Sequence, residues 1–209
     1  SMKVLADSLL MQEEVPAELY KEFMQDMSEE IERENKIIND LLSLVKMDKT
    51  ANVMNIITAD INELVERTLK RLRPIAAERN IELVFESFRP VTADVDEVKL
   101  TLAISNLVEN AIKYNKVNGW VHVSLDADHK YFFVKVTDSG CGIPEEAQEH
   151  IFERFYRVDK SHSREIGGTG LGLAIAKNIV LMHKGIIEIS SVVDEGTTIV
   201  VRIPLNYIV

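Results

Sequence analysis

The chain of 209 residues has few cysteines, few basic residues and no long apolar run. Its single cysteine excludes an internal disulfide and fits a reducing compartment. No apolar run approaches the length of about 20 residues that spans a bilayer, and there is no signal-peptide pattern. The 24 Lys and Arg residues stand against 34 Asp and Glu, a formal net charge of −10, which argues against general binding to nucleic acid or to an anionic membrane.

A hydrophobic fraction of 46% in a chain of this length allows one full domain and a smaller element. Residues 18–48 predict one long helix, because apolar residues recur at alternating steps of three and four. This heptad-like stripe consists of Tyr20, Met24, Met27, Ile31, Ile38, Leu41 and Val45, and Glu34 interrupts it. Residues 3–11 predict the end of a preceding helix, joined through a turn at 13–16. A hairpin with so little contact area favours a four-helix dimer with a second copy; the alternative is a hairpin packed on the domain that follows.

After a polar hinge at 46–50, the pattern mixes helices with strands. Strands are predicted near 53–57, 81–85, 121–125, 132–136, 187–189 and 199–203. Helices are predicted from Asp60 towards Asn80, with Pro74 kinking or shortening it, from Asp94 through 113, and over 171–182. Asp60 with Glu63 and Asp94 with Glu97 are the two N-cap signatures. The order predicts an α+β fold, a two-layer α/β sandwich with a mixed sheet and helices on one face.

Two segments carry groups that suit a metal–nucleotide. In the stretch 106–115, Asn106, Asn110 and Lys113 share one helix face. Amide oxygens can bind Mg²⁺ and a lysine can meet phosphate, although an asparagine on a helix is more often a solvated residue. In the stretch 138–144, Asp138 closes a strand before a tight turn with Gly140 and Gly142, whose missing side chains permit close approach. An ordinary hairpin turn is the alternative for that stretch.

Two later segments extend the pattern. Residues 152–159 combine aromatic with basic residues, and residues 167–175 form a glycine-rich loop that opens an apolar helix. Exposed amides at such a helix start favour phosphate. A flexible loop before a closely packed helix is the alternative.

These four segments, in this order and spacing, resemble the nucleotide-binding boxes of sensor histidine kinases, in the superfamily that includes gyrase-type ATPases. The resemblance covers residues 50–209 closely and residues 1–49 more loosely. It implies a catalytic ATP-binding domain over 50–209 and a partial dimerisation and phosphotransfer hairpin over 1–49. The implied ligands are ATP and Mg²⁺, and the implied partners are a second copy of the chain and a response-regulator receiver domain. We expect a cytoplasmic location, with any membrane attachment through segments upstream of this chain.

The resemblance also assigns roles to individual residues. It implies that Asp138 selects adenine and that Asn110 and Asn106 hold Mg²⁺. It also implies that residues 152–168 form a mobile lid whose base Phe152 and Phe155 anchor by apolar contact. Arg157 or Lys160 would reach the terminal phosphate. The expected catalytic set is Asn110, Lys113 and Arg157. The expected cofactor-binding set adds Asn106, Tyr114, Asp138, Gly140, Gly142, Ile143, Phe155, Lys160, Gly168, Thr169, Gly170, Leu171, Gly172 and Thr198.

One position separates the candidate reactions. Gyrase-type relatives place a water-activating glutamate where this chain has Asn106, and an amide cannot act as a general base. We therefore expect poor ATP hydrolysis and phosphoryl transfer to a histidine, then to a response-regulator aspartate. None of the five histidines fits the family's acceptor box, so we expect the acceptor upstream of this chain and no autophosphorylation within it. The alternatives are an anti-sigma-factor-type serine kinase and a nucleotide-binding dimerisation scaffold.

Overall fold

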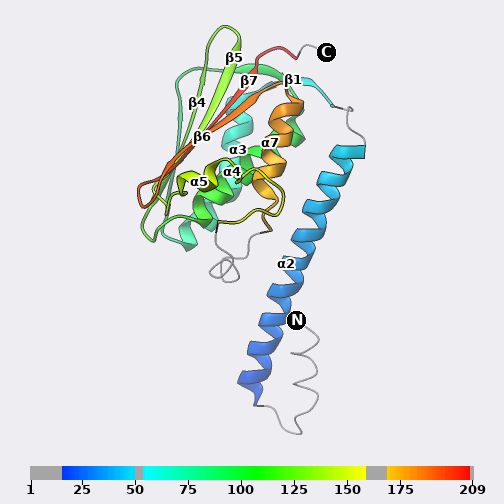
Figure 1. The fold of residues 1–209 in the computed structure, drawn as a ribbon, viewed down its shortest axis with the longest axis vertical. Coiled ribbons are helices and arrows are strands. Elements are labelled where there is room, and N and C mark those ends of the chain that lie inside the picture. Colours follow the sequence, from blue (N-terminus) through cyan, green and yellow to red (C-terminus); the bar gives the residue numbers. More distant parts are fainter. Residues whose placement is uncertain (1–15, 50–53, 159–168, 208–209) are drawn as a thin grey trace. The chain divides into compact units, whose positions relative to one another are not determined.

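The computed structural model describes residues 16–49, 54–158 and 169–207. The chain divides into two compact units, Ser1–Asp48 and Lys49–Val209 (Figure 1). Within the described ranges, no helix is long and apolar enough to cross a membrane. The helix predicted over residues 3–11 and almost all of the turn after it lie outside the described residues, as do Lys160 and Gly168.

The first unit is described through one long helix. Helix α2 (Ala17–Lys49) confirms the prediction of a single helix over 18–48. Large apolar side chains along it are exposed: Tyr20, Met24, Ile31, Ile38, Leu41 and Leu42. Five of these six belong to the predicted heptad-like stripe. The helix therefore presents an apolar stripe to its surroundings, as the sequence predicts.

The second unit is built on a five-stranded mixed sheet, as predicted. Its order is β2 (Glu82–Ser87), β4 (Trp120–Ala127), β5 (Tyr131–Asp138), β7 (Gly196–Pro204) and β6 (Ile186–Val192). Strands β2 and β4 are parallel, and the other neighbours are antiparallel. A separate two-stranded sheet pairs β1 (Ile57–Asp60) with β3 (Thr92–Val95).

Three helices cover one face of this sheet (Figure 1). They are α3 (Ile61–Glu78), α4 (Glu97–Lys113) and α7 (Gly172–Met182), and a short α5 (Glu145–Gln148) lies near one end of β6. Alternate side chains of the central strands are buried beneath them, including Phe132, Val134 and Val136. The alternation confirms the two-layer sandwich and places the core between sheet and helices.

Two sequence-based boundaries need correction, at the start of β1 and at the cap of α4. Strand β1 begins at Ile57, later than the predicted start near residue 53. Pro74 lies exposed inside α3, which continues to Glu78 and so nearly reaches the predicted end at Asn80; the kink at Pro74 stays a prediction. Asp94 is not the N-cap of α4: it lies in β3 and accepts a hydrogen bond from the Thr58 hydroxyl at 2.7 Å. The other predicted cap is confirmed, since Asp60 accepts from Glu63 N at 3.0 Å.

The N-cap of α4 is Asp96, which belongs to a buried network. Its Oδ1 accepts from Lys99 N at 3.1 Å, and its Oδ2 accepts from Lys99 Nζ and from Asn55 N. Its own amide donates to Nε2 of His183 at 3.0 Å, while Nδ1 of that ring lies 2.8 Å from Ile179 O. The network joins the end of α7 to the start of α4.

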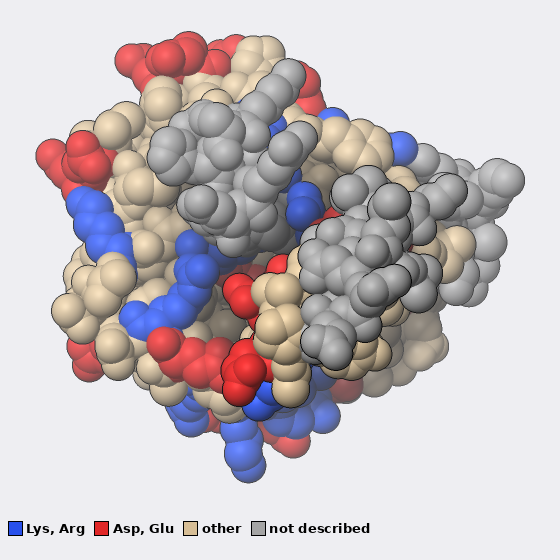
Figure 2. Space-filling view, turned by 90° about the horizontal axis from the view of Figure 1, so that it is seen from below, with Lys and Arg blue, Asp and Glu red and all other residues tan. Residues whose placement is uncertain are grey.

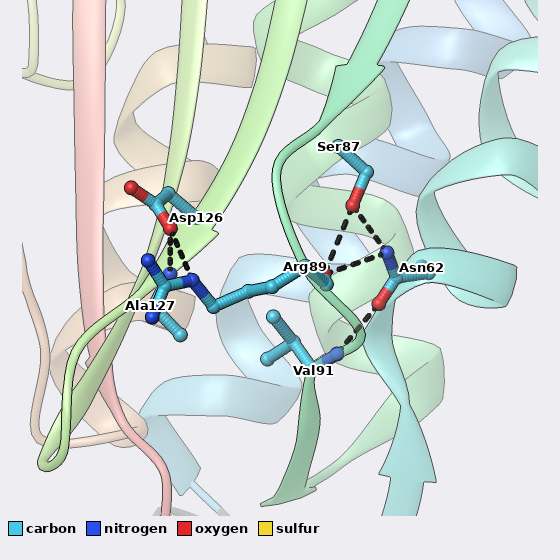
Figure 3. A network of polar contacts seen from close by, with 6 residues as sticks. All are labelled: Asn62, Ser87, Arg89, Val91, Asp126 and Ala127. Carbon is cyan, nitrogen blue, oxygen red and sulfur yellow. Dashed lines mark hydrogen bonds and ion pairs between the residues drawn. The ribbon is translucent and has the colours of Figure 1, made fainter.

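A second polar network holds the connection between β2 and β3 (Figure 3). Asn62 on α3 accepts from Val91 N at 2.7 Å and donates to Arg89 O at 3.2 Å and to the Ser87 hydroxyl. The Arg89 guanidinium in turn pairs with Asp126 on β4 at 2.8 Å. One asparagine thus ties this connection to the first turn of α3.

Candidate nucleotide site

The asparagine face of α4 meets the first turn of α7. Asn106 is only 9% exposed, and a Cβ added to Gly172 would lie 3.3 Å from its Oδ1. Its Nδ2 is buried with no hydrogen-bond partner in the part of the chain that the structure describes. Asn110 and Lys113 follow on the same helix and are partly exposed. The structure therefore brings Asn106 to the start of the helix that follows the glycine loop, with Asn110 one turn further along α4.

Basic and aromatic groups gather where α4 ends. The Lys113 ammonium lies over the Tyr114 ring, 5.6 Å from its centroid. Burial raises the pKa of Tyr114, and the charge of nearby Arg157 opposes that rise. Figure 2 shows exposed Lys and Arg side chains interspersed with Asp and Glu on the described surface, although the chain as a whole is acidic. Cations at this end of α4 suit an anionic ligand.

The carboxylate of Asp138 is fixed by one of its oxygens. Asp138 is the last residue of β5, and its Oδ1 accepts from Gly140 N at 2.8 Å and from Thr197 N at 3.2 Å. The described residues donate both of these hydrogen bonds to Oδ1. The other oxygen, Oδ2, is therefore left to accept a hydrogen bond from a ligand. Burial raises the pKa of the Asp138 carboxyl, and the two hydrogen bonds oppose the rise.

The turn after Asp138 is pressed between two other segments. Gly142 has φ +67°, and a Cβ there would lie 2.0 Å from Val192 O. A Cβ on Gly140 would lie 2.5 Å from Tyr114 O. Glycine is therefore needed here so that the backbone of the turn can pack closely against Tyr114, and not because the backbone is left-handed. Cys141, between them, donates its amide to Tyr114 O at 3.1 Å. The turn therefore runs between the end of α4 and the β6–β7 hairpin.

The base of the predicted lid differs from expectation. Phe155 is 59% exposed with φ +64°, so the predicted apolar anchor at this residue is wrong. It contacts the glycine loop through its backbone instead: Phe155 N donates to Gly170 O at 2.9 Å. Gly170, at φ +70°, leaves room for this approach. Thr169 and Leu171 lie beside Gly170, and Leu171 is buried.

Strand register separates two neighbouring threonines. Asp138 lies opposite Thr197, whereas Thr198 lies opposite Thr137 and donates to its hydroxyl at 3.2 Å. Because side chains alternate along a strand, Thr198 lies on the face away from Asp138, and the structure does not support its predicted contact with a nucleotide. Thr197 lies on the Asp138 face instead, and its alternation with buried Ile199 is the sequence signal that could have indicated this.

The chemistry of these groups fits a magnesium nucleotide. The site combines an unpartnered buried amide, a carboxylate with one oxygen available, glycines that leave space and cations beside them. In the described ranges no cluster of three or more His, Cys, Asp or Glu residues could hold a metal ion. A cation held by asparagine would thus need phosphate and water as its other ligands, which suits Mg²⁺.

Comparisons with known proteins agree with this geometry. Residues 95–207 match the family model described as histidine kinase-, DNA gyrase B- and HSP90-like ATPase. Sensor protein kinase WalK of Staphylococcus epidermidis is 36% identical over 193 residues, which is 91% of this chain and 32% of that protein. The chain therefore spans about a third of the length of the curated relatives that it matches.

Solved structures show the same fold. The mycobacterial sensor histidine kinase MprB aligns with a TM-score of 0.63 and 30% identity, over 73% of this chain and 99% of that chain. Histidine kinase ThkA in complex with response regulator protein TrrA aligns with a TM-score of 0.78 over 98% of this chain and 57% of that chain. At 22% identity, this second likeness concerns the fold alone.

Proposed function

Since the chain belongs to the family of histidine kinase-, DNA gyrase B- and HSP90-like ATPases and contains the ATP-binding domain of a sensor histidine kinase, we propose that residues 50–209 bind Mg-ATP at the site described above. The full protein would pass the γ-phosphoryl group to a histidine outside this chain, and from there to a response-regulator aspartate. One observation carries the proposal: the domain contains both an Asp138 carboxylate that is hydrogen-bonded through Oδ1 alone and, beside α7, a buried Asn106 amide whose Nδ2 has no partner among the described residues.

The adenine end of the site is the turn after β5. Asp138 Oδ2 would accept a hydrogen bond from the exocyclic amine of adenine, while Oδ1 stays bound to two backbone amides. Gly140, Gly142 and Ile143 would lie along the base, in a turn that the two glycines allow to pack against Tyr114 and Val192. A carboxylate accepts hydrogen bonds only, so it favours adenine over a base that presents a carbonyl at that position.

The phosphate end lies between α4 and the glycine loop. We assign Asn110 to Mg²⁺ and Lys113 and Arg157 to the phosphates, with Thr169, Gly170 and Leu171 as the loop beside them. Asn106 is the second candidate ligand for the cation, and its burial beneath Gly172 also suits a hydrogen bond from Nδ2 to a phosphate oxygen or bound water. Bound Mg²⁺ would neutralise phosphate charge, and the protein would supply positioning.

The chemistry at position 106 favours transfer over hydrolysis. Asn106 has no proton-accepting carboxylate with which to activate water. The exposed apolar stripe of α2 supports pairing with a second copy in a four-helix bundle, which would complete the homodimer typical of such kinases. We propose an acceptor histidine and a response-regulator receiver domain, the latter as a separate partner, from the sensor kinases that this chain resembles over about a third of their length.

The test uses γ-labelled ATP with Mg²⁺ and two chains refolded together. One is the present chain, and the other is a longer chain that includes the upstream acceptor and carries Asn110→Asp, so that it cannot use ATP itself. Label on the longer chain, absent from the present chain alone, supports a histidine kinase that transfers between protomers. If neither the mixture nor the wild-type longer chain becomes labelled, the kinase assignment is wrong, and a serine kinase or a scaffold remains.

A further inference from the structure

A row of polar side chains crosses three strands beside the proposed base site. Ser191 on β6 lies opposite Thr197 on β7, which lies opposite Asp138 on β5. By strand alternation all three share the face of the buried residues Ile199 and Val136, which the helices cover. The row therefore reaches from the edge strand to the proposed adenine-binding carboxylate.

Ser191 holds the turn that follows Asp138. Its hydroxyl accepts a hydrogen bond from Ile143 N at 2.8 Å and lies 2.9 Å from Gly196 O and 2.8 Å from the Thr197 hydroxyl. A hydroxyl donates one hydrogen bond and accepts two. All three contacts are satisfied together if Thr197 donates to Ser191 and Ser191 donates to Gly196 O. This one side chain thus joins the turn to both strands of the hairpin.

Gln148 on α5 holds the other backbone polar group of the same residue, Ile143. Its Nε2 donates to Ile143 O at 2.9 Å and to Ser191 O at 2.8 Å. Both the amide and the carbonyl of Ile143 are therefore bound by side chains from outside the turn. We call this pair of side chains the Ile143 clamp.

The turn needs such a clamp because its own sequence does not fix its shape. It contains two glycines within three residues, and Gly142 has φ +67°. Glycine loses more conformational freedom on ordering than any other residue. A ligand that has to order the turn itself binds more weakly than one that meets a turn already in place.

We propose that Ser191 and Gln148 are positioning residues for the nucleotide base: they hold the 140–143 turn and, through Thr197, the Asp138 carboxylate in the geometry that accepts adenine. This inference rests on the proposed function. Neither residue contacts the nucleotide. Their effect is on the affinity for ATP and on the preference for a base that carries the exocyclic amine.

The test measures the dissociation constants of ATP and of purine riboside triphosphate, which lacks that amine, with Mg²⁺ present. Ser191→Ala should weaken ATP binding about tenfold, which is the scale of one or two hydrogen bonds. It should weaken binding of the analogue less, so the ratio of the two dissociation constants should move closer to one. Ser191→Thr keeps the hydroxyl and should restore most of both. Ser190→Ala, on the opposite face of β6, is the matched control and should bind like wild type.

Gln148→Ala gives an independent reading through a different element, with the exposed neighbour Glu149→Ala as its control. It should also narrow the preference for ATP. Far-UV circular dichroism checks that each variant is folded, and if Ser191→Ala does not fold, Gln148→Ala decides.

The outcomes separate two failures. A wild-type chain that does not bind ATP overturns the proposed function and this inference with it. A wild-type chain that prefers ATP, with Ser191→Ala and Gln148→Ala showing the same preference, overturns the clamp alone. Equal weakening of ATP and analogue also overturns it, because general destabilisation would act on both ligands alike.

Discussion

Replacing His183 with phenylalanine tests the buried network between α7 and α4. The ring is 1% exposed; its Nε2 accepts from Asp96 N at 3.0 Å, and its Nδ1 lies 2.8 Å from Ile179 O. These contacts require a neutral ring with its proton on Nδ1. A second proton on Nε2 would face the Asp96 amide, donor against donor.

The size of the effect follows from what the substitution leaves behind. Phenylalanine is somewhat larger than histidine, so the substitution leaves no cavity at this buried site. Ile179 O still accepts from His183 N at 3.1 Å through the helix, but the buried Asp96 amide loses the ring as its acceptor. A buried donor without an acceptor costs about 1–3 kcal/mol. His183→Gln should lose less, because its amide oxygen can accept. Urea unfolding followed by the fluorescence of Trp120, the single tryptophan, reports on the second unit.

The pH dependence gives a sharper test of the same network. Burial lowers the pKa of His183; the hydrogen bond to Ile179 O and the Asp96 carboxylate oppose this, and Lys99 adds to it. The unfolded chain therefore takes up the proton first, near the ordinary pKa of about 6.5. Stability from this group is complete above that pH and is lost as the pH falls below it towards the lowered pKa of the folded state.

Comparison of wild type with His183→Phe isolates this contribution. The free energy of unfolding of wild type should fall more steeply between about pH 7 and about pH 5 than that of the variant. His150→Gln is the matched control. The hydrogen bond to Glu153 raises the pKa of exposed His150, the opposite direction to His183, so removing His150 should not remove the loss of stability at low pH. Parallel curves for wild type and His183→Phe would refute the neutral buried ring.

Three further predictions concern stability and nucleotide binding. Asn62→Ala should lower the urea-unfolding free energy by about 1–3 kcal/mol, and Arg89→Ala, which removes an exposed ion pair, by less than about 1 kcal/mol; equal losses would contradict the network in Figure 3. Asp96→Ala should lower the melting temperature more than Asp94→Ala, and the reverse order would argue against Asp96 as the cap of α4. Gly142→Ala should weaken ATP binding by more than about tenfold in a calorimetric titration, because its φ is +67°; unchanged affinity would exclude strain there.

The sequence predicts the elements whose pattern is local. Strands β4, β5 and β7 alternate buried with more exposed residues along most of their length, and α2 and α4 repeat apolar residues at helical spacing. Strand β1 has no such pattern, since Ala59 is its one buried residue. It forms because it pairs with β3, some 35 residues away, and that pairing also holds Asp94 in extended backbone. Contacts at that separation leave no periodic signal in either segment.

The same division applies to the site. Asp138, Gly140 and Gly142 come from one short stretch, so the sequence places them together. Thr197 and Ser191 join Asp138 only through strand pairing: local alternation can indicate the face of Thr197, but not that these three residues are neighbours. Phe155 shows the converse failure: an aromatic residue predicts apolar contact, but a left-handed backbone turns this one towards solvent.

The two kinds of error differ in their consequences for function. Moving the N-cap of α4 from Asp94 to Asp96 changes where the helix begins but leaves Asn106 and Asn110 one turn apart on the same face. Moving one residue along β7, from Thr198 to Thr197, exchanges the two faces of the sheet. The helix residues of the site, Asn106 and Asn110, can therefore be predicted from their spacing in the sequence. The strand residues cannot, because their neighbours depend on a register that only strand pairing defines.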